Sequence, residues 1–188
     1  MLTDTTSISN GIRLHGAEYV DLDTGGGLAN FWTLECWFKL YKIPGEMKII
    51  HYRPTSGDAN DVRMFINNSK LCGIAVGSGG SGGGATYKHY EGATTLSLET
   101  WYHGVVTWDG QAGTLNVYLN ASADTSYTKT SDGTVAMTDT TRNRQIGKNA
   151  VASSEYFNGQ IDEVRIYSKV LSATEITTNY NNGKSAHS

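Results

Sequence analysis

The sequence predicts an all-β domain that closes with one short helix. Many short segments alternate between apolar and polar residues, and turn-forming glycine and asparagine separate them. The chain has 22 Gly, 11 Tyr and 2 Pro among 188 residues, a composition typical of strands and turns. This length suits a single domain over residues 1–188, with an N-terminal arm at 1–10 and a frayed tail at 181–188.

The first half of the chain predicts five strands or more. Residues 12–22 are expected to form a hairpin around His15-Gly16-Ala17-Glu18, and residues 31–40 a half-buried strand. The apolar face of that strand is Leu34, Cys36, Phe38 and Leu40, and its other face is Thr33, Glu35, Trp37 and Lys39. Further strands are expected at 48–52, 62–66 and 71–76. The glycine-rich stretch 77–84 then predicts a long hairpin loop, not a domain boundary.

The second half predicts a strand at 86–90 and a long hairpin of 101–109 with 114–120. Residues 125–141 are polar and predict a loop with one weak strand, and 144–147 predict another short strand.

The end of the chain carries the clearest pattern. Asn158-Gly159 is a turn signal, and strict alternation after it places Asp162, Val164 and Ile166 on one face of a strand. The spacing of Ser172 and Glu175 is that of a capping box, so a short helix is expected near 172–180.

Four segments resemble a known family. They are IRLHGAEYVDL (12–22), FWTLECWFKL (31–40), TWYHGVVTWDGQAGTLNVYLN (100–120) and FNGQIDEVRIYSKVLSATEI (157–176). Together they are similar to laminin-G-like jelly-roll domains of the concanavalin A-like lectin/glucanase superfamily. The resemblance implies a two-sheet antiparallel jelly-roll sandwich with a short C-terminal helix. It names no ligand, because this fold hosts lectins, adhesion domains, glycosidases and structural modules.

Charge and cysteine content narrow the function classes. A formal charge of −3 with scattered basic residues argues against nucleic-acid binding. No apolar run approaches the roughly 18 residues that span a bilayer, so no membrane span is expected. The two cysteines, Cys36 and Cys72, lack metal-ligand spacing, and Cys36 is expected to be a buried thiol, with a disulfide as the alternative.

The N-terminus predicts no signal peptide, because residues 1–6 lack a basic region and an apolar region. A lectin-like domain usually acts outside a cell, so we expect an extracellular location or the surface of a particle. A trimmed mature form, export by a carrier, or release within a virus particle would each reconcile the two expectations.

A calcium site is the first candidate for chemistry. Asp162 is expected on the inward face of its strand, where an unpaired carboxylate is costly to bury. The resemblance implies that Asp162 holds a structural calcium ion with a backbone carbonyl from the His15-Gly16 turn; Gly16 is the second ligand residue. The alternative is an aspartate that accepts backbone hydrogen bonds. A second acidic cluster, Asp58, Asn60 and Asp61, is expected to be a solvated loop.

A sugar-binding surface is the second candidate. Sugars stack on aromatic faces and bind amide and carboxylate groups through their hydroxyls. The residues that suit this role are Trp32, Trp37, Tyr52, Tyr87, His89 and Tyr90. Trp37, beside Glu35 and Lys39, and Tyr87 with His89 are candidates for lining the concave sheet, and packing is the favoured role for Trp37.

Catalysis is not expected. Retaining glucanases of this fold place their carboxylates about 5 Å apart in a Glu-x-Asp-x-x-Glu run, which the sequence lacks. Asp162 and Glu163 are adjacent, so in a strand they point to opposite faces. The expected function is a non-catalytic binding or adhesion module that recognises carbohydrate or another surface ligand. The alternative is a structural protein of a virus particle or similar assembly, which a large apolar surface patch would favour.

Overall fold

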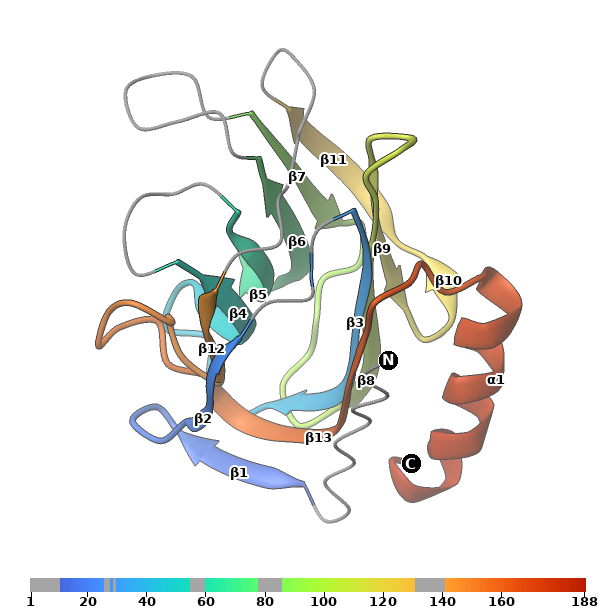
Figure 1. Ribbon diagram of the computed structural model, residues 1–188. Helices are drawn as coiled ribbons and strands as arrows, with labels where there is room; N and C mark the ends of the chain where they lie inside the picture. Colours follow the sequence, from blue (N-terminus) through green and yellow to red (C-terminus); the bar gives the residue numbers. More distant parts are fainter. Residues whose placement is uncertain (1–10, 26–27, 29, 55–59, 78–85, 131–140) are drawn as a thin grey trace.

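Two antiparallel sheets pack face to face, and one helix covers the outer side of one sheet (Figure 1). The computed structural model describes residues 11–25, 28, 30–54, 60–77, 86–130 and 141–188, with the backbone alone for 125–130. The predicted arm at 1–10 and most of the glycine-rich loop lie outside these residues. The predicted jelly-roll sandwich with a C-terminal helix is confirmed.

The six-stranded sheet has the order β1-β13-β3-β8-β9-β10. Its strands are β1 (Ile12–His15), β13 (Asn158–Tyr167), β3 (Phe31–Leu40), β8 (Trp101–Asp109), β9 (Thr114–Leu119) and β10 (Ser122–Ala123). The seven-stranded sheet has the order β11-β7-β6-β5-β4-β12-β2. Its strands are β11 (Thr125–Thr130), β7 (Tyr87–Gly92), β6 (Lys70–Val76), β5 (Val62–Asn67), β4 (Met47–Arg53), β12 (Arg142–Ile146) and β2 (Val20–Gly25).

The predicted hairpin at residues 12–22 is wrong. β1 pairs with β13 in the six-stranded sheet, whereas β2 pairs with β12 in the seven-stranded sheet. The turn at Gly16, where φ is +90°, therefore carries the chain from one sheet to the other. Sequence alternation identifies each strand, but it does not say which sheet a strand joins.

The core lies between the sheets and takes alternate residues from each. The predicted apolar face of β3 is confirmed, since Leu34, Cys36, Phe38 and Leu40 are all 0% exposed. Met64 and Ile66 of β5 meet the same core from the opposite sheet. Cys36 and Cys72 are both buried thiols without a disulfide.

A bulge in β13 overturns the predicted strict alternation. Asp162 lies opposite Trp37 and Arg165 lies opposite Glu35, so two residues of β13 face one residue of β3. The extra residue is Glu163, whose φ of +48° is stabilised by its N–H donating to Asp162 Oδ1 at 2.7 Å. Asp162 therefore points to the outer face of the sheet, although Val164 still enters the core.

The C-terminal helix α1 (Ala173–Gly183) is confirmed, and it begins with the predicted capping box. Ser172 Oγ accepts from Glu175 N at 3.3 Å, and Glu175 Oε2 accepts from Ser172 N at 2.8 Å. Ile176 packs on Val105 and Leu171 in a second apolar cluster outside the sheet. No helix in the described ranges is both long enough and apolar enough to cross a membrane.

The tail does not fray, contrary to the prediction for 181–188. The helix continues to Gly183, a 3-10 turn follows at Lys184–Ala186, and His187 is 6% exposed. The imidazole of His187 stacks on the Trp37 ring with centroids 4.4 Å apart and 6° between the planes. Gly183 also lies against the Trp37 indole, where a Cβ would collide. Stacking on Trp37 thus anchors the end of the chain.

Replacing Gly159 by alanine is expected to lower the free energy of unfolding by about 1–3 kcal/mol. A Cβ at this position collides with the backbone oxygen of Lys39 on β3, which cannot move without disturbing the pairing of β3 with β13. Urea denaturation at pH 7 measures the change. Gly45→Ala is the control, since nothing lies within 4 Å of its added Cβ, and its effect should stay within about 0.5 kcal/mol. Equal losses in the two variants would contradict the steric explanation.

Candidate functional site

The outer face of the seven-stranded sheet carries polar side chains from four adjacent strands. His51, Arg63, Ile74 and His89 are successive cross-strand partners on β4, β5, β6 and β7, so they share one face. The alternate residues of these strands enter the core. We call this surface the polar sheet face. It comprises His51, Arg53, Asp61, Arg63, Phe65, Cys72, Ile74, Val76, Tyr87, His89 and Glu91.

Asp61 organises one half of the polar sheet face. Its carboxylate is 0% exposed and accepts from Arg63 Nε at 2.9 Å and from Arg63 Nη2 at 2.5 Å. Arg53 Nε lies 3.7 Å from Asp61 Oδ2. The Arg53 and Arg63 side chains are 21% and 22% exposed, so the buried carboxylate holds two guanidinium groups at the surface.

His51 completes this cluster as a neutral donor. Ala150 N donates to His51 Nδ1 at 3.0 Å, which leaves the proton on Nε2 for donation to Asp61 Oδ1, also at 3.0 Å. Burial lowers the pKa of His51, in spite of the opposing effect of Asp61. Burial would by itself raise the pKa of Asp61, but hydrogen bonds from His51 and Arg63 outweigh it and lower that pKa to about 2. One buried carboxylate thus faces two guanidinium groups.

The predicted solvated loop at 58–61 is wrong for Asp61. Asp58 lies outside the described residues, and Asn60 is 6% exposed. An aspartate directly before a strand that carries Arg63, with His51 on the preceding strand, was the signal available in the sequence. Using it requires the pairing of β4 with β5, which sequence alternation does not supply.

The other half of the polar sheet face lies on β6 and β7. Tyr87 and His89 are half-buried, and the rings of His89 and Phe65 have centroids 5.5 Å apart. His89 Nε2 lies 3.9 Å from Glu91 Oε1. Burial raises the pKa of the neighbouring Cys72 thiol to about 12, so this thiol is neutral at pH 7.

Of the residues predicted to bind sugar, the structure places only Tyr87 and His89 on the polar sheet face. Trp37 and Tyr52 are each 2% exposed, and Trp32 is 0% exposed. Their predicted role is corrected to packing, because a ring face already covered by protein atoms cannot stack on a ligand. Tyr52 lies in the core, and burial raises its pKa to about 12. Tyr90 is half-buried and packs against the same core.

Asp162 and Gly16 do not form the predicted calcium site. β1 pairs with β13 through His15 opposite Asn158, so Gly16 lies beyond that end of the ladder. Asp162 is four residues further along β13, which is about 13 Å away. Asp162 instead accepts from Glu163 N and lies 3.2 Å from His187 Nε2 through Oδ2. The alternative of an aspartate that accepts a backbone hydrogen bond agrees with this geometry.

A buried polar network lies on the other sheet, beneath α1. Glu35 is 0% exposed, and its carboxylate lies 2.8 Å from His103 Nε2 and 3.3 Å from Arg165 Nη1. Asn179 Nδ2 of the helix donates to Glu35 Oε2 at 2.9 Å and to the Tyr167 hydroxyl at 3.2 Å. The helix thereby satisfies a carboxylate that the sheet alone would leave exposed. The alternation of β3 placed Glu35 on this face, but nothing in the sequence showed that a helix covers it.

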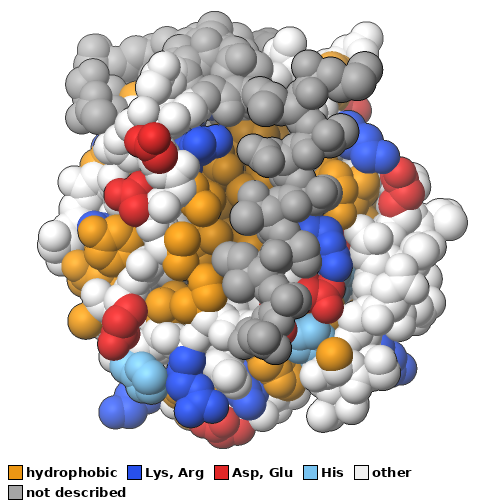
Figure 2. Space-filling model, turned by 60° about the horizontal axis from the view of Figure 1, so that its bottom comes forward, with side chains coloured by type: hydrophobic (Ala, Val, Ile, Leu, Met, Phe, Trp, Pro, Cys, Tyr) orange, Lys and Arg blue, Asp and Glu red, His pale blue; other side chains and the backbone are white. Residues whose placement is uncertain are grey.

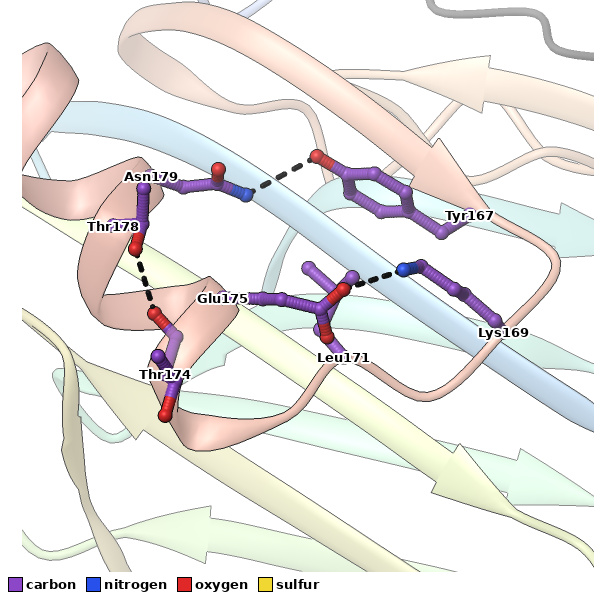
Figure 3. A pocket seen from close by; sticks show the side chains of 7 residues that line it. All are labelled: Tyr167, Lys169, Leu171, Thr174, Glu175, Thr178 and Asn179. Carbon is purple, nitrogen blue, oxygen red and sulfur yellow. Dashed lines mark hydrogen bonds and ion pairs between the residues drawn. The ribbon is translucent and has the colours of Figure 1, made fainter.

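A small cavity of about 210 Å³ opens beside this network (Figure 3). Its lining residues are Tyr167, Lys169, Leu171, Thr174, Glu175, Thr178 and Asn179. Lys169 Nζ and Glu175 Oε1 form an ion pair of 2.6 Å on its rim. Sites for small organic ligands usually enclose about 300–1,000 Å³, so this cavity is too small for an oligosaccharide.

A larger cavity of about 370 Å³ is lined by two glutamates, but their geometry does not suit glycosidase chemistry. Glu46 and Glu155 both pair with the ammonium of Lys48, which lies 3.1 Å from Glu155 Oε2. A general acid needs a raised pKa. Burial raises the pKa of Glu155, but the charge of Lys48 and hydrogen bonds from Lys48 and Asn149 outweigh it, so the net shift is downward. The two carboxylates therefore neutralise a buried lysine, whose own pKa burial lowers to about 8.

Residues 14–177 match the Laminin_G_3 family of the concanavalin A-like lectin/glucanases superfamily. The chain belongs to this superfamily. This match covers most of the chain and confirms the resemblance seen in the four sequence segments. No curated protein has a sequence that matches this member of the superfamily significantly.

Solved structures share the fold at low sequence identity. The CBM40 of Ruminococcus gnavus IT-sialidase, bound to α2,3-sialyllactose, has a TM-score of 0.68 at 13% identity, over 90% of this chain and 96% of that chain. Domain 4 of a GH43 extracellular arabinanase from Geobacillus stearothermophilus, in complex with arabinotriose, has a TM-score of 0.59 at 19% identity, over 89% and 75%. The receptor-binding domain of botulinum neurotoxin C/D mosaic serotype has a TM-score of 0.64 at 16% identity, over 94% and 43%.

Replacing Asp61 by asparagine is expected to lower the free energy of unfolding by about 3 kcal/mol at pH 7. The reason is that the guanidinium groups of Arg53 and Arg63 then lose the buried carboxylate that compensates their charge. The pKa of Asp61 is about 2 in the folded protein against a usual value of 3.8. Its ionised form therefore stabilises the fold fully above pH 3.8, and this contribution is lost as pH falls towards 2. The difference in the free energy of unfolding between wild type and Asp61→Asn should therefore become smaller by about 2 kcal/mol as the pH falls from above 3.8 to 2.

Urea denaturation at pH 7, 4 and 2 measures this difference. Asp21→Asn on β2 is the control, because Asp21 is exposed, and it should show no comparable change with pH. A difference for Asp61→Asn that stays constant from pH 7 to pH 2 would exclude the proposed ion pairing.

Proposed function

We propose that this domain is a non-catalytic carbohydrate-binding module that acts outside the cell and binds its ligand on the polar sheet face. The observation that carries this proposal is that two half-buried rings, Tyr87 and His89, lie on the same sheet face as two guanidinium groups. These belong to Arg53 and Arg63 and are partly exposed. An aromatic ring stacks on the C–H face of a sugar, and guanidinium groups donate to its hydroxyl or carboxylate oxygens.

The structural neighbours support the same class of ligand. Two of them, the sialidase CBM40 and the arabinanase domain, are complexes with oligosaccharides. Similarity of fold alone does not establish function. The proposal therefore depends on the polar sheet face, and the neighbours support its choice of ligand class.

Recognition by a pre-formed surface agrees with the way this face is built. Asp61 and His51 are buried and hydrogen-bonded, so Arg63 is oriented before a ligand arrives. Orienting side chains in advance reduces the entropy lost on binding. The geometry therefore favours binding of the ligand by a surface that is already formed, without a reaction on the ligand.

The alternative is protein–protein contact within an assembly. Figure 2 shows hydrophobic side chains gathered in the middle of one face, with side chains of both charges interspersed around them, and this gathering favours the alternative. Among the described residues, the large hydrophobic side chains that are more than a third exposed are Tyr19, Phe31, Leu98 and Val151. Carbohydrate binding remains the leading proposal, because Tyr87, His89 and the two guanidinium groups share the polar sheet face and two structural neighbours hold oligosaccharides.

Replacing Tyr87 by alanine is expected to weaken glycan binding by about tenfold or more, equivalent to about 1.4 kcal/mol of lost stacking. The measurement is binding of the purified chain to a broad glycan array, followed by titration of the best ligand. Tyr19→Ala is the matched control, since this exposed tyrosine lies outside the polar sheet face, and it should bind like wild type.

Two outcomes would count against the proposal. Absence of any saturable ligand on the array would exclude carbohydrate recognition for the glycans tested. Equal losses in Tyr87→Ala and Tyr19→Ala would place binding elsewhere on the molecule.

A further inference from the structure

Three side chains of different chemistry converge at the β7 end of the polar sheet face. They are Cys72 of β6 with His89 and Glu91 of β7. One donor atom from each, the thiol sulfur, an imidazole nitrogen and a carboxylate oxygen, lies within 4.8 Å of the other two. In the described part of the chain, no other three His, Cys, Asp or Glu residues come this close.

Strand pairing produces this convergence. Cys72 is the cross-strand partner of Glu91, and cross-strand partners point to the same face of a sheet. His89 precedes Glu91 by two residues on the same strand, so its side chain also points to that face. The positions of all three groups are therefore set by the backbone of two paired strands, not by a loop.

We propose that Cys72, His89 and Glu91 bind one divalent transition-metal ion, with zinc as the preferred ion. Thiolate, imidazole and carboxylate are the donors that zinc takes in proteins, whereas calcium and magnesium take oxygen donors. On binding, the ion displaces the Cys72 proton to solvent, and the resulting thiolate and the Glu91 carboxylate together neutralise the charge of a divalent ion. Three protein ligands leave a fourth position for water or another ligand.

The distances suit this ion. Zinc bonds of about 2.0–2.3 Å in a tetrahedral site place ligand atoms roughly 3.3–3.8 Å apart. His89 Nε2 and Glu91 Oε1 already lie 3.9 Å apart. Since the three donor atoms lie within 4.8 Å of one another, the sulfur needs to approach by at most about 1–1.5 Å, a shift within reach of side-chain rotation. These two side chains are 18% and 16% exposed, so solvent reaches the site from one side.

The surroundings support the site on its buried side. Phe65 is 2% exposed and lies against the His89 ring, so an apolar wall limits movement of the imidazole. Two described lysines lie near Cys72: Lys70, two residues earlier on β6, and Lys48. Lys48 lies 4.8 Å from the centre of the Phe65 ring, and the carboxylates of Glu46 and Glu155 compensate its charge.

The test is titration of the metal-free full chain with cobalt(II), which takes zinc sites and reports its ligands by absorption. We expect one cobalt ion per chain, a thiolate-to-cobalt charge-transfer band in the near ultraviolet, and loss of that band on adding one equivalent of zinc. Cys72→Ala should abolish the band. His89→Ala and Glu91→Gln should each weaken zinc binding by more than about tenfold, since even residues that only orient a metal ligand change affinity by about 10–100-fold.

Two controls separate this site from adventitious binding. Cys36→Ala removes the chain's other thiol, which lies in the core, and should retain the charge-transfer band. His15→Ala removes an imidazole that is 61% exposed and should leave the affinity unchanged. Because His89 and Glu91 are partly exposed, their variants test the site even if Cys72→Ala fails to fold.

Absence of the band from the wild-type chain at saturating cobalt would overturn the proposal, as would equal zinc affinity in wild type, His89→Ala and Glu91→Gln. The titration contains no sugar. Its outcome therefore does not depend on whether the polar sheet face binds carbohydrate.

Discussion

Burial of both faces of β3 is the constraint on which the rest of this structure depends. Its inner face meets the core of the sandwich, and its outer face lies beneath α1, so that Glu35 and Trp37 are as buried as Leu34. A strand covered on both sides has to satisfy every polar group that it carries. Glu35 meets this requirement through His103, Arg165 and Asn179.

The two sheets differ in what lies over their outer faces. α1 and the final turn cover the outer side of β3, whereas Arg53, Arg63, Tyr87 and His89 of the polar sheet face remain partly exposed. The same packing explains why the tail is ordered. His187 stacks on Trp37, so the C-terminal residues of the protein cover a ring that was a candidate for binding sugar.

Buried charges divide the molecule into rigid and adaptable parts. The cluster of Asp61, His51 and Arg63 and the pairs of Lys48 with Glu46 and Glu155 each place an ionic group inside a network of partners. Removing one partner from such a network costs far more stability than an exposed pair would. The proposed ligand surface is therefore supported by buried groups that resist movement, and the less buried side chains of β7 lie at its edge.

The sequence by itself determined most strands and the capped helix, because alternation, turn residues and the capping box are local signals. The sandwich followed from the resemblance to laminin-G-like domains. The sequence also identified Tyr87 and His89 as candidates, because they are two residues apart on a predicted strand, and both lie on one face of β7 in the structure. The tertiary structure alone decided that Trp37 and Tyr52 are packed and that Asp162 lies far from Gly16. Only the tertiary structure, too, brought Asp61 to His51, and Cys72 to Glu91. The physical reason is that burial and clustering depend on which strands pair and on what covers each sheet. In addition, a bulge such as that at Glu163 turns a neighbouring side chain to the opposite face of the sheet, and the sequence pattern does not indicate where a bulge occurs.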